Sequence, residues 1–190
     1  MVISKLSMPE SNNQNFNHLK IHTQYSICEG AIKIDNLKDF CKENKIPCLG
    51  LSDTSNLCGA LEFAENISKV GTQPIIGTQI FFRFEDTTGL LPLIALNEKG
   101  YKRIIELSSR SYLENDALSD PHLDIKELLI DSEGVSLLSG TIQGLFGKLF
   151  EKGRLDEISK IYKSLSSKFN DNFYLEIQRH GDQNEIAFEK

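Results

Sequence analysis

Short apolar runs alternate along this chain with amphipathic segments of helical length, and this alternation most restricts how the chain can fold. The apolar runs cover residues 18–22, 48–51, 74–84, 90–96, 135–138 and 173–178. Residues at helical spacing occupy 35–44, 57–70, 98–112, 124–130, 144–151 and 154–169, and a further helix begins at 185. Strands that alternate with helices predict an α/β fold with mostly parallel strands. A turn at residues 85–89 predicts one hairpin within the sheet.

Size and composition indicate a globular domain. The chain has 190 residues, of which 39% are hydrophobic and 25% charged, as in ordinary globular proteins. Its net charge of −6 argues against non-specific DNA binding by this domain, because phosphate neutralisation requires clustered Lys and Arg. No apolar run reaches the roughly 18–20 residues of a membrane span. Residues 1–15 are polar and are expected to form a flexible tail before a domain at 16–190.

The cysteines give no sign of a structural zinc site. None of the four forms a CxxC pair, which is the spacing typical of zinc knuckles. We expect reduced thiols, partly within the core. They are Cys28, Cys41, Cys48 and Cys58.

Polar side chains follow two of the apolar runs, at the ends where α/β barrels carry their functional sites. His22 ends the first run and Asp53 ends the second, and metal sites are built from such side chains. The neighbouring Lys20 and Thr54 are poor ligands, because a protonated lysine has no acceptor atom. The pattern indicates a hydrolase-like rim that has lost its metal site. A structural His22, and a salt bridge or helix cap at Asp53, are the simpler alternatives.

Six sequence blocks in one order carry a family resemblance. The chain resembles the PHP (polymerase and histidinol phosphatase) domain at the N-terminus of the bacterial DNA polymerase III alpha subunit, from about Phe16 to its end. The blocks are His18-Leu19-x-x-His22-Thr23-x-Tyr25-Ser26, Glu29-Gly30-Ala31, Leu51-Ser52-Asp53 with Asn56-Leu57-x-Gly59-Ala60, Pro74-Ile75-Ile76-Gly77, Leu137-Leu138-Ser139-Gly140 and Tyr174-Leu175-Glu176-Ile177.

The resemblance implies a distorted (β/α)7 TIM-like PHP barrel, which we expect to be incomplete because the chain ends early. It also implies His, Asp and Glu ligands for Zn²⁺ or Mn²⁺ at the strand ends. Carried over by position, the family's ligand sites are altered here, and no metal or other cofactor is expected. The vestigial metal-site positions are Lys20, His22, Asp53, Thr54, Gln79 and His180.

The altered positions suggest a replacement for the metal. A family His is Lys20 here and a family Glu is Gln79, so each change adds one unit of positive charge. The sum resembles the charge of one divalent cation. We therefore expect Lys20 to take the place of a metal, pairing with Asp53 and hydrogen-bonding Gln79.

The resemblance further implies the function. The chain is expected to be the PHP portion of a DNA-directed DNA polymerase, a cytoplasmic nucleotidyltransferase of DNA replication, and to be a scaffold without catalytic residues of its own. Its implied partners are the rest of the alpha subunit and the proofreading exonuclease subunit, with DNA contacted through the full polymerase and no membrane involved. The alternative is an active metal-dependent phosphoesterase or 3′–5′ exonuclease.

Overall fold

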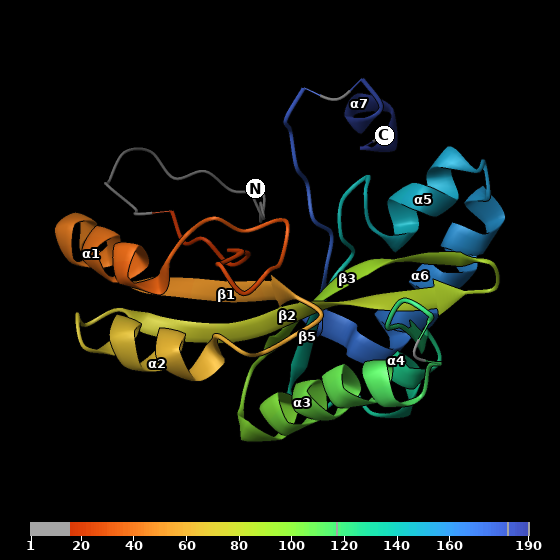
Figure 1. Cartoon of the computed structure of the whole chain (residues 1–190). Helices are drawn as coiled ribbons and strands as arrows, with labels where there is room; N and C mark the ends of the chain where they lie inside the picture. Colours follow the sequence, from red (N-terminus) through yellow and green to blue (C-terminus); the bar gives the residue numbers. More distant parts are fainter. Residues whose placement is uncertain (1–15, 117, 182, 190) are drawn as a thin grey trace.

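The computed structural model describes residues 16–116, 118–181 and 183–189 (Figure 1). The expected tail, residues 1–15, lies outside the described residues. The elements follow in this order: α1 (Ile34–Asn44), β1 (Cys48–Thr54), α2 (Ala60–Ser68), β2 (Gln73–Phe84), β3 (Thr87–Ala95), α3 (Glu98–Leu113), β4 (Leu123–Asp124), α4 (Glu127–Ile130), β5 (Val135–Leu138), α5 (Leu145–Glu151), α6 (Leu155–Phe169), a 3-10 turn (Asn170–Asn172), β6 (Phe173–Tyr174) and α7 (Glu185–Phe188).

The strands form one mixed sheet in the order β1-β2-β3-β5-β6, with β4 beside β2. Strands β1 and β4 run parallel to β2, and β6 runs parallel to β5. The predicted hairpin is present as the antiparallel β2–β3 pair. Because β3 is thereby reversed, its next neighbour β5 also pairs with it in antiparallel fashion. The predicted α/β class is confirmed, with more antiparallel pairing than the sequence indicated.

Residues 18–23 extend the sheet beyond β1. The Ile21 amide donates to the Gly50 carbonyl at 3.1 Å, and the Ser52 amide donates to the Ile21 carbonyl at 2.8 Å. Gly50 permits this approach, since a Cβ at that position would lie 2.5 Å from the Leu19 carbonyl oxygen. This segment and β6 are therefore the two edges of the described sheet.

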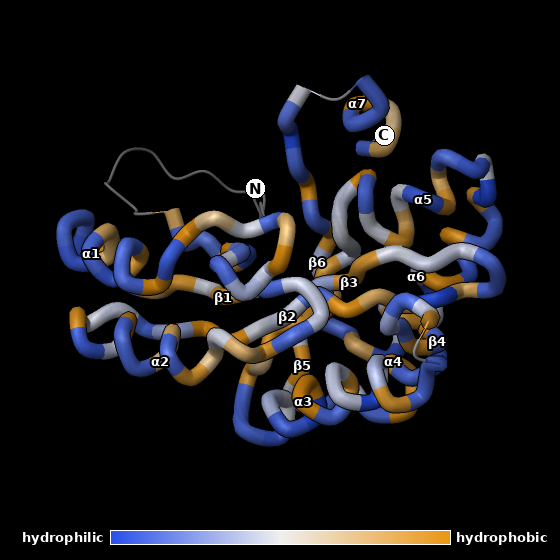
Figure 2. Tube along the Cα trace, viewed as in Figure 1, coloured by the Kyte–Doolittle hydropathy of each residue, from blue (hydrophilic) through white to orange (hydrophobic). Residues whose placement is uncertain are grey.

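Alternating side chains along the strands divide the sheet into two faces. Ile80 and Phe82 of β2 join Leu91 and Leu93 of β3 in the larger core, which α3, α4, α5 and α6 complete. A second core lies between β1 and the helices α1 and α2. Figure 2 shows apolar residues along β3 and β5 and polar residues on the outer sides of the helices. The opposite face of β2 and β3 lines a pocket.

Several element boundaries differ from the sequence prediction, and three of the differences bear on the ends of the sheet and its helices. Helix α1 has Lys33 at its N-cap, and Asp35, the predicted cap, lies in its first turn. Helix α4 begins only at Glu127, because Asp124 belongs to β4. Strand β6 ends at Tyr174, four residues before the predicted end at 178. No helix in the described ranges is long and apolar enough to cross a bilayer.

Candidate functional site at the strand ends

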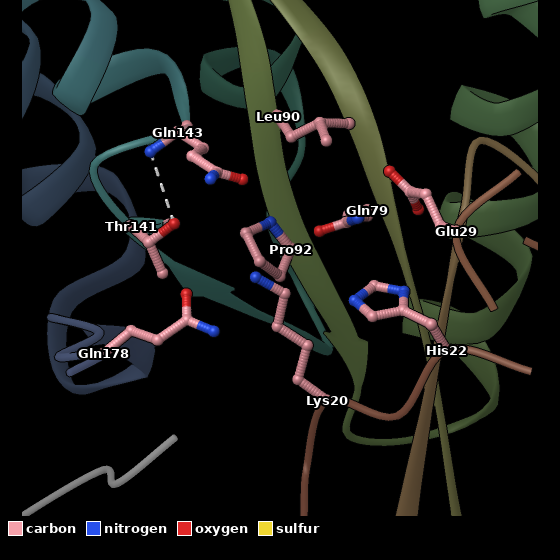
Figure 3. Close-up of a pocket in the computed structure, with 11 residues that line it drawn as sticks. Lys20, His22, Glu29, Gln79, Leu90, Pro92, Thr141, Gln143 and Gln178 are labelled. Atoms are coloured by element: carbon pink, nitrogen blue, oxygen red, sulfur yellow. Dashed lines mark hydrogen bonds between the residues drawn. The ribbon is translucent and has the colours of Figure 1, made fainter. Parts of the chain in front are cut away.

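A polar pocket of about 380 Å³ opens at the strand ends (Figure 3). Lys20, His22, Glu29 and Gln79 enter it from one side, while Thr141, Gln143 and Gln178 face them from the other. Its lining is completed by Leu90 and Pro92 of β3, Gly140 and Gly144. Positions 20, 22 and 79, which the sequence analysis grouped, thus line one cavity.

Lys20, which lines this pocket, forms an ion pair with Glu176, which lies behind the lining residues. Its Nζ lies 3.1 Å from Glu176 Oε1, and the two side chains are 11% and 0% exposed. Lys20 belongs to one edge of the sheet, and Glu176 follows the strand at the other edge. The sheet is therefore curled enough for a single ion pair to join its two edges. A buried pair of this kind becomes costly to the fold when one partner is removed.

The expected pair between Lys20 and Asp53 is wrong. Asp53 is fully buried, and its carboxylate accepts bonds from the Thr23 amide at 2.6 Å, the Thr23 hydroxyl at 2.8 Å and the Ser26 hydroxyl at 2.7 Å. Adjacent residues of a strand point to opposite faces. The Thr54 side chain points toward Gln79, so the Asp53 side chain points away from the pocket. Asp53 instead fixes the loop that carries His22.

Thr54 and Gln79 form a polar link at the pocket wall. The two residues are directly paired between β1 and β2, and Gln79 Nε2 donates to Thr54 Oγ1 at 2.7 Å. The Thr54 hydroxyl in turn donates to the Glu29 carboxylate. The expected bond between Lys20 and Gln79 is therefore replaced by a chain that runs from Gln79 through Thr54 to Glu29.

His22 lines the pocket as a neutral imidazole. Its Nδ1 atom is buried and has no hydrogen bond of regular geometry within the described residues. Burial lowers the pKa of His22 from its ordinary value of 6.5, and the Lys20 charge lowers it further, against opposing effects of Glu29, Asp53 and the Ser52 backbone. The ring therefore resists protonation in the folded state.

This depressed pKa predicts that His22 makes stability dependent on pH. The unfolded chain takes up a proton at His22 at higher pH than the folded chain does, so stability falls as pH decreases below about 6.5. We expect His22→Gln to lose less stability than the wild type between pH 7 and pH 5. Urea unfolding at both pH values tests this, and equal losses in the two proteins would contradict it.

His180 does not reach the pocket. Its side chain is exposed, and its backbone amide donates to Glu185 at 2.8 Å. Gln178, two residues earlier, occupies the pocket wall instead. The His180 side chain therefore does not lie at the site position that the family resemblance assigns to it.

The pocket does not fit a catalytic metal. Lys20 has no lone pair to offer, and Thr54 and Gln79 are neutral and bonded to each other. His22 and Glu29 remain, whereas a catalytic zinc site requires three protein ligands. In residues 16–116, 118–181 and 183–189, no three His, Cys, Asp or Glu side chains are grouped to hold a metal ion.

Two charged residues of the site were missed as site residues from the sequence. Glu176 and Glu29 each fall within a recognised sequence block, but neither was assigned to the pocket. An acidic residue between Leu175 and Ile177 was the available signal for Glu176, since carboxylates are rarely buried without a partner. The direction of the Glu29 side chain depends on the conformation of its loop, which no periodic pattern in the sequence predicts.

A pocket ringed by polar side chains at the strand ends is typical of α/β domains that carry a functional site at that edge of the sheet. The PHP domain family matches residues 18–180. The chain therefore belongs to the PHP domain family, and this membership agrees with the predicted fold.

Similar proteins carry the domain as a small part of a longer chain. The chain is 38% identical to DNA polymerase III subunit alpha of Caulobacter vibrioides, over 96% of its own length and 17% of that protein. It is 34% identical to DNA polymerase III subunit alpha of Rickettsia felis, over 87% of its own length and 14% of that protein. The chain thus spans less than a fifth of the length of these relatives.

A solved structure with a related arrangement is that of a putative metal-dependent phosphoesterase from Bifidobacterium adolescentis. It is 14% identical, with a TM-score of 0.41, over 91% of this chain and 63% of that one.

Proposed function

We propose that this chain is the PHP region of a DNA polymerase III alpha subunit and serves there as a scaffold without catalytic activity of its own. The identity to alpha subunits over 96% and 87% of the chain supports the first part. The second part depends on the buried Lys20–Glu176 pair. In this proposal the pair takes the place of the metal that the family's strand-end ligands would hold.

An ion pair of this kind suits a structural role better than a hydrolytic one. Phosphoester hydrolysis in such a site requires a metal to generate the nucleophile and to neutralise charge. The Lys20 ammonium supplies positive charge but no activated water, and Glu176 already balances it. What the pair supplies is a link between the two sheet edges.

The proposed partners follow from this role. The rest of the alpha subunit would rest on the domain, and the proofreading exonuclease subunit would dock on it. With a net charge of −6, the domain itself would leave DNA binding to the remainder of the cytoplasmic polymerase. Co-purification of the exonuclease subunit with this domain, compared with an alpha subunit lacking it, tests the docking role.

The first test of the proposal is metal content and activity. We expect protein purified without chelator to contain well below one Zn or Mn per chain by elemental analysis, because among the described residues only two suitable donors line the pocket. We also expect no hydrolysis of phosphomonoesters or of single-stranded DNA 3′ ends with Mn²⁺, Zn²⁺ or Mg²⁺. Turnover that His22→Ala abolishes would overturn the proposal.

Restoring the family's ligands should restore metal binding. Positions 20 and 79 line the same pocket, and Thr54 touches Gln79. The variant Lys20→His/Thr54→His/Gln79→Glu should therefore bind Zn²⁺ with a dissociation constant in the micromolar range or below, and Zn²⁺ at a hundred times that constant would add about 2.7 kcal/mol of stability. The control is Lys20→Gln/Thr54→Gln, which changes two of the same positions without adding a His or carboxylate donor. A triple variant that Zn²⁺ does not stabilise would show that these positions do not converge on one ion.

A further inference from the structure

A small apolar groove lies far along the chain from the pocket residues 20–29, between α4, α6 and the end of β2. Its volume is about 220 Å³. Ile125, Ile161 and Leu165 form its floor and are themselves almost fully buried. The complete lining is Phe84, Ile125, Lys126, Leu129, Lys160, Ile161, Ser164 and Leu165. The groove is thus an apolar floor with polar residues from two helical segments at its mouth.

The charge at the mouth is positive. Lys126 and Lys160 are exposed, and neither forms an ion pair with any residue in the described part of the chain. Of the acidic neighbours, Glu127 binds Arg110 at 2.6 Å, while the exposed Asp124 and Asp156 form no ion pair with either lysine among the described residues. Two exposed lysines without an ion pair at one apolar groove stand out in a chain of net charge −6.

We propose that this groove docks an acidic peptide segment of a protein partner, with one apolar side chain inserted between Lys126 and Lys160. The volume is below the roughly 300–1,000 Å³ typical of small-molecule sites, so it suits a side chain better than a free ligand. Burial of that side chain against the floor supplies affinity, and carboxylates on either side of it meet the lysines. Charged rim contacts of this kind mainly guide association and selectivity.

The probe for this site is a pair of synthetic peptides added to the complete chain with ¹³C-labelled Ile and Leu methyl groups. The acidic peptide is acetyl-Glu-Asp-Leu-Phe-Asp-Glu-amide, and its control replaces every acid by the matching amide. We expect the acidic peptide to shift the methyl resonances of Leu129, Ile161 and Leu165. The amide peptide should bind at least about threefold more weakly, and higher salt should reduce that difference.

Two variants with matched controls assign the binding to the groove. Lys126→Gln/Lys160→Gln should weaken the acidic peptide about three- to tenfold, as expected for two exposed charges. Lys33→Gln/Lys69→Gln removes the same charge from exposed positions elsewhere and should leave affinity unchanged. Ser164→Phe should fill the groove and abolish the methyl shifts, whereas Ser159→Phe, on an exposed part of α6 outside the lining, should not.

Other occupants would overturn the proposal. Equal binding of the two peptides, or binding unaffected by Ser164→Phe, would show that the groove does not recognise an acidic apolar segment. Methyl shifts at the groove with duplex DNA or anionic lipid vesicles but not with the acidic peptide would assign it to another polyanion. Self-association by sedimentation that Ser164→Phe removes, without peptide binding, would assign it to a second copy of this chain.

Discussion

Replacing Lys20 by methionine is expected to lower the free energy of unfolding by about 3–5 kcal/mol, the range measured when one partner of a buried ion pair is removed. Glu176 is the reason: its side chain is 0% exposed, and its second oxygen has no hydrogen-bond partner within the described residues. Without Lys20 that carboxylate would be buried and uncompensated. Urea denaturation at neutral pH measures the loss.

Two comparisons separate this effect from a simple loss of packing. Lys20→Met/Glu176→Leu removes both charges and should recover most of the stability, because an apolar pair can replace a buried ion pair at little cost. Lys99→Met breaks the pair with Glu133 at a half-exposed site and should change stability far less, since solvent screens exposed pairs. A double variant as unstable as Lys20→Met would contradict the proposed role of the pair.

Asp53→Ala is expected to be similarly destabilising, by about 3–5 kcal/mol, since hydrogen bonds to a charged group contribute about 1.5–3 kcal/mol each. Its carboxylate accepts one amide and two hydroxyl groups from Thr23 and Ser26. The hydroxyls can turn to other acceptors, but the buried Thr23 amide cannot. Denaturation measures the loss, and amide hydrogen exchange at Thr23 should accelerate beyond what the loss of global stability accounts for.

Asp53→Asn is the matched control for this prediction. It keeps an oxygen for the Thr23 amide and the Ser26 hydroxyl, and its amide group can donate to Thr23 Oγ1, so a loss of about 1–2 kcal/mol is expected. If asparagine and alanine were equally destabilising, the negative charge rather than the bonding pattern would be what the loop requires.

Most helices and strands could be predicted from the sequence because each has a characteristic spacing of apolar residues. Apolar residues at helical spacing located α3 and α6, and the brief run at Val135–Leu138 located β5 at both ends. Positions 20 and 79 were grouped with His22 by the family resemblance, whose ligand positions lie at the ends of neighbouring strands. The first result depends on local repetition that a single sequence contains, and the second depends on the resemblance.

The predictions were wrong or incomplete where the outcome depends on how the strands are arranged in space. Asp53 was assigned to the pocket because it ends an apolar run and matches a family ligand position, but the pleat turns adjacent side chains to opposite faces. Glu176 was missed because it meets Lys20 only through the curl of the entire sheet. The β3–β5 pairing was missed because a crossover helix does not reveal which strand its successor joins.

The Lys20–Glu176 contact also has a consequence for the timing of folding. Its partners are 156 residues apart, and at about 5–20 residues per second of bacterial synthesis, Glu176 is made about 8–30 s after Lys20. In that interval residues 18–23 can pair with β1, but Lys20 does not yet have Glu176 as its partner. The two edges can be tied together only after residue 176 has left the ribosome, so this contact forms late in the assembly of the described sheet.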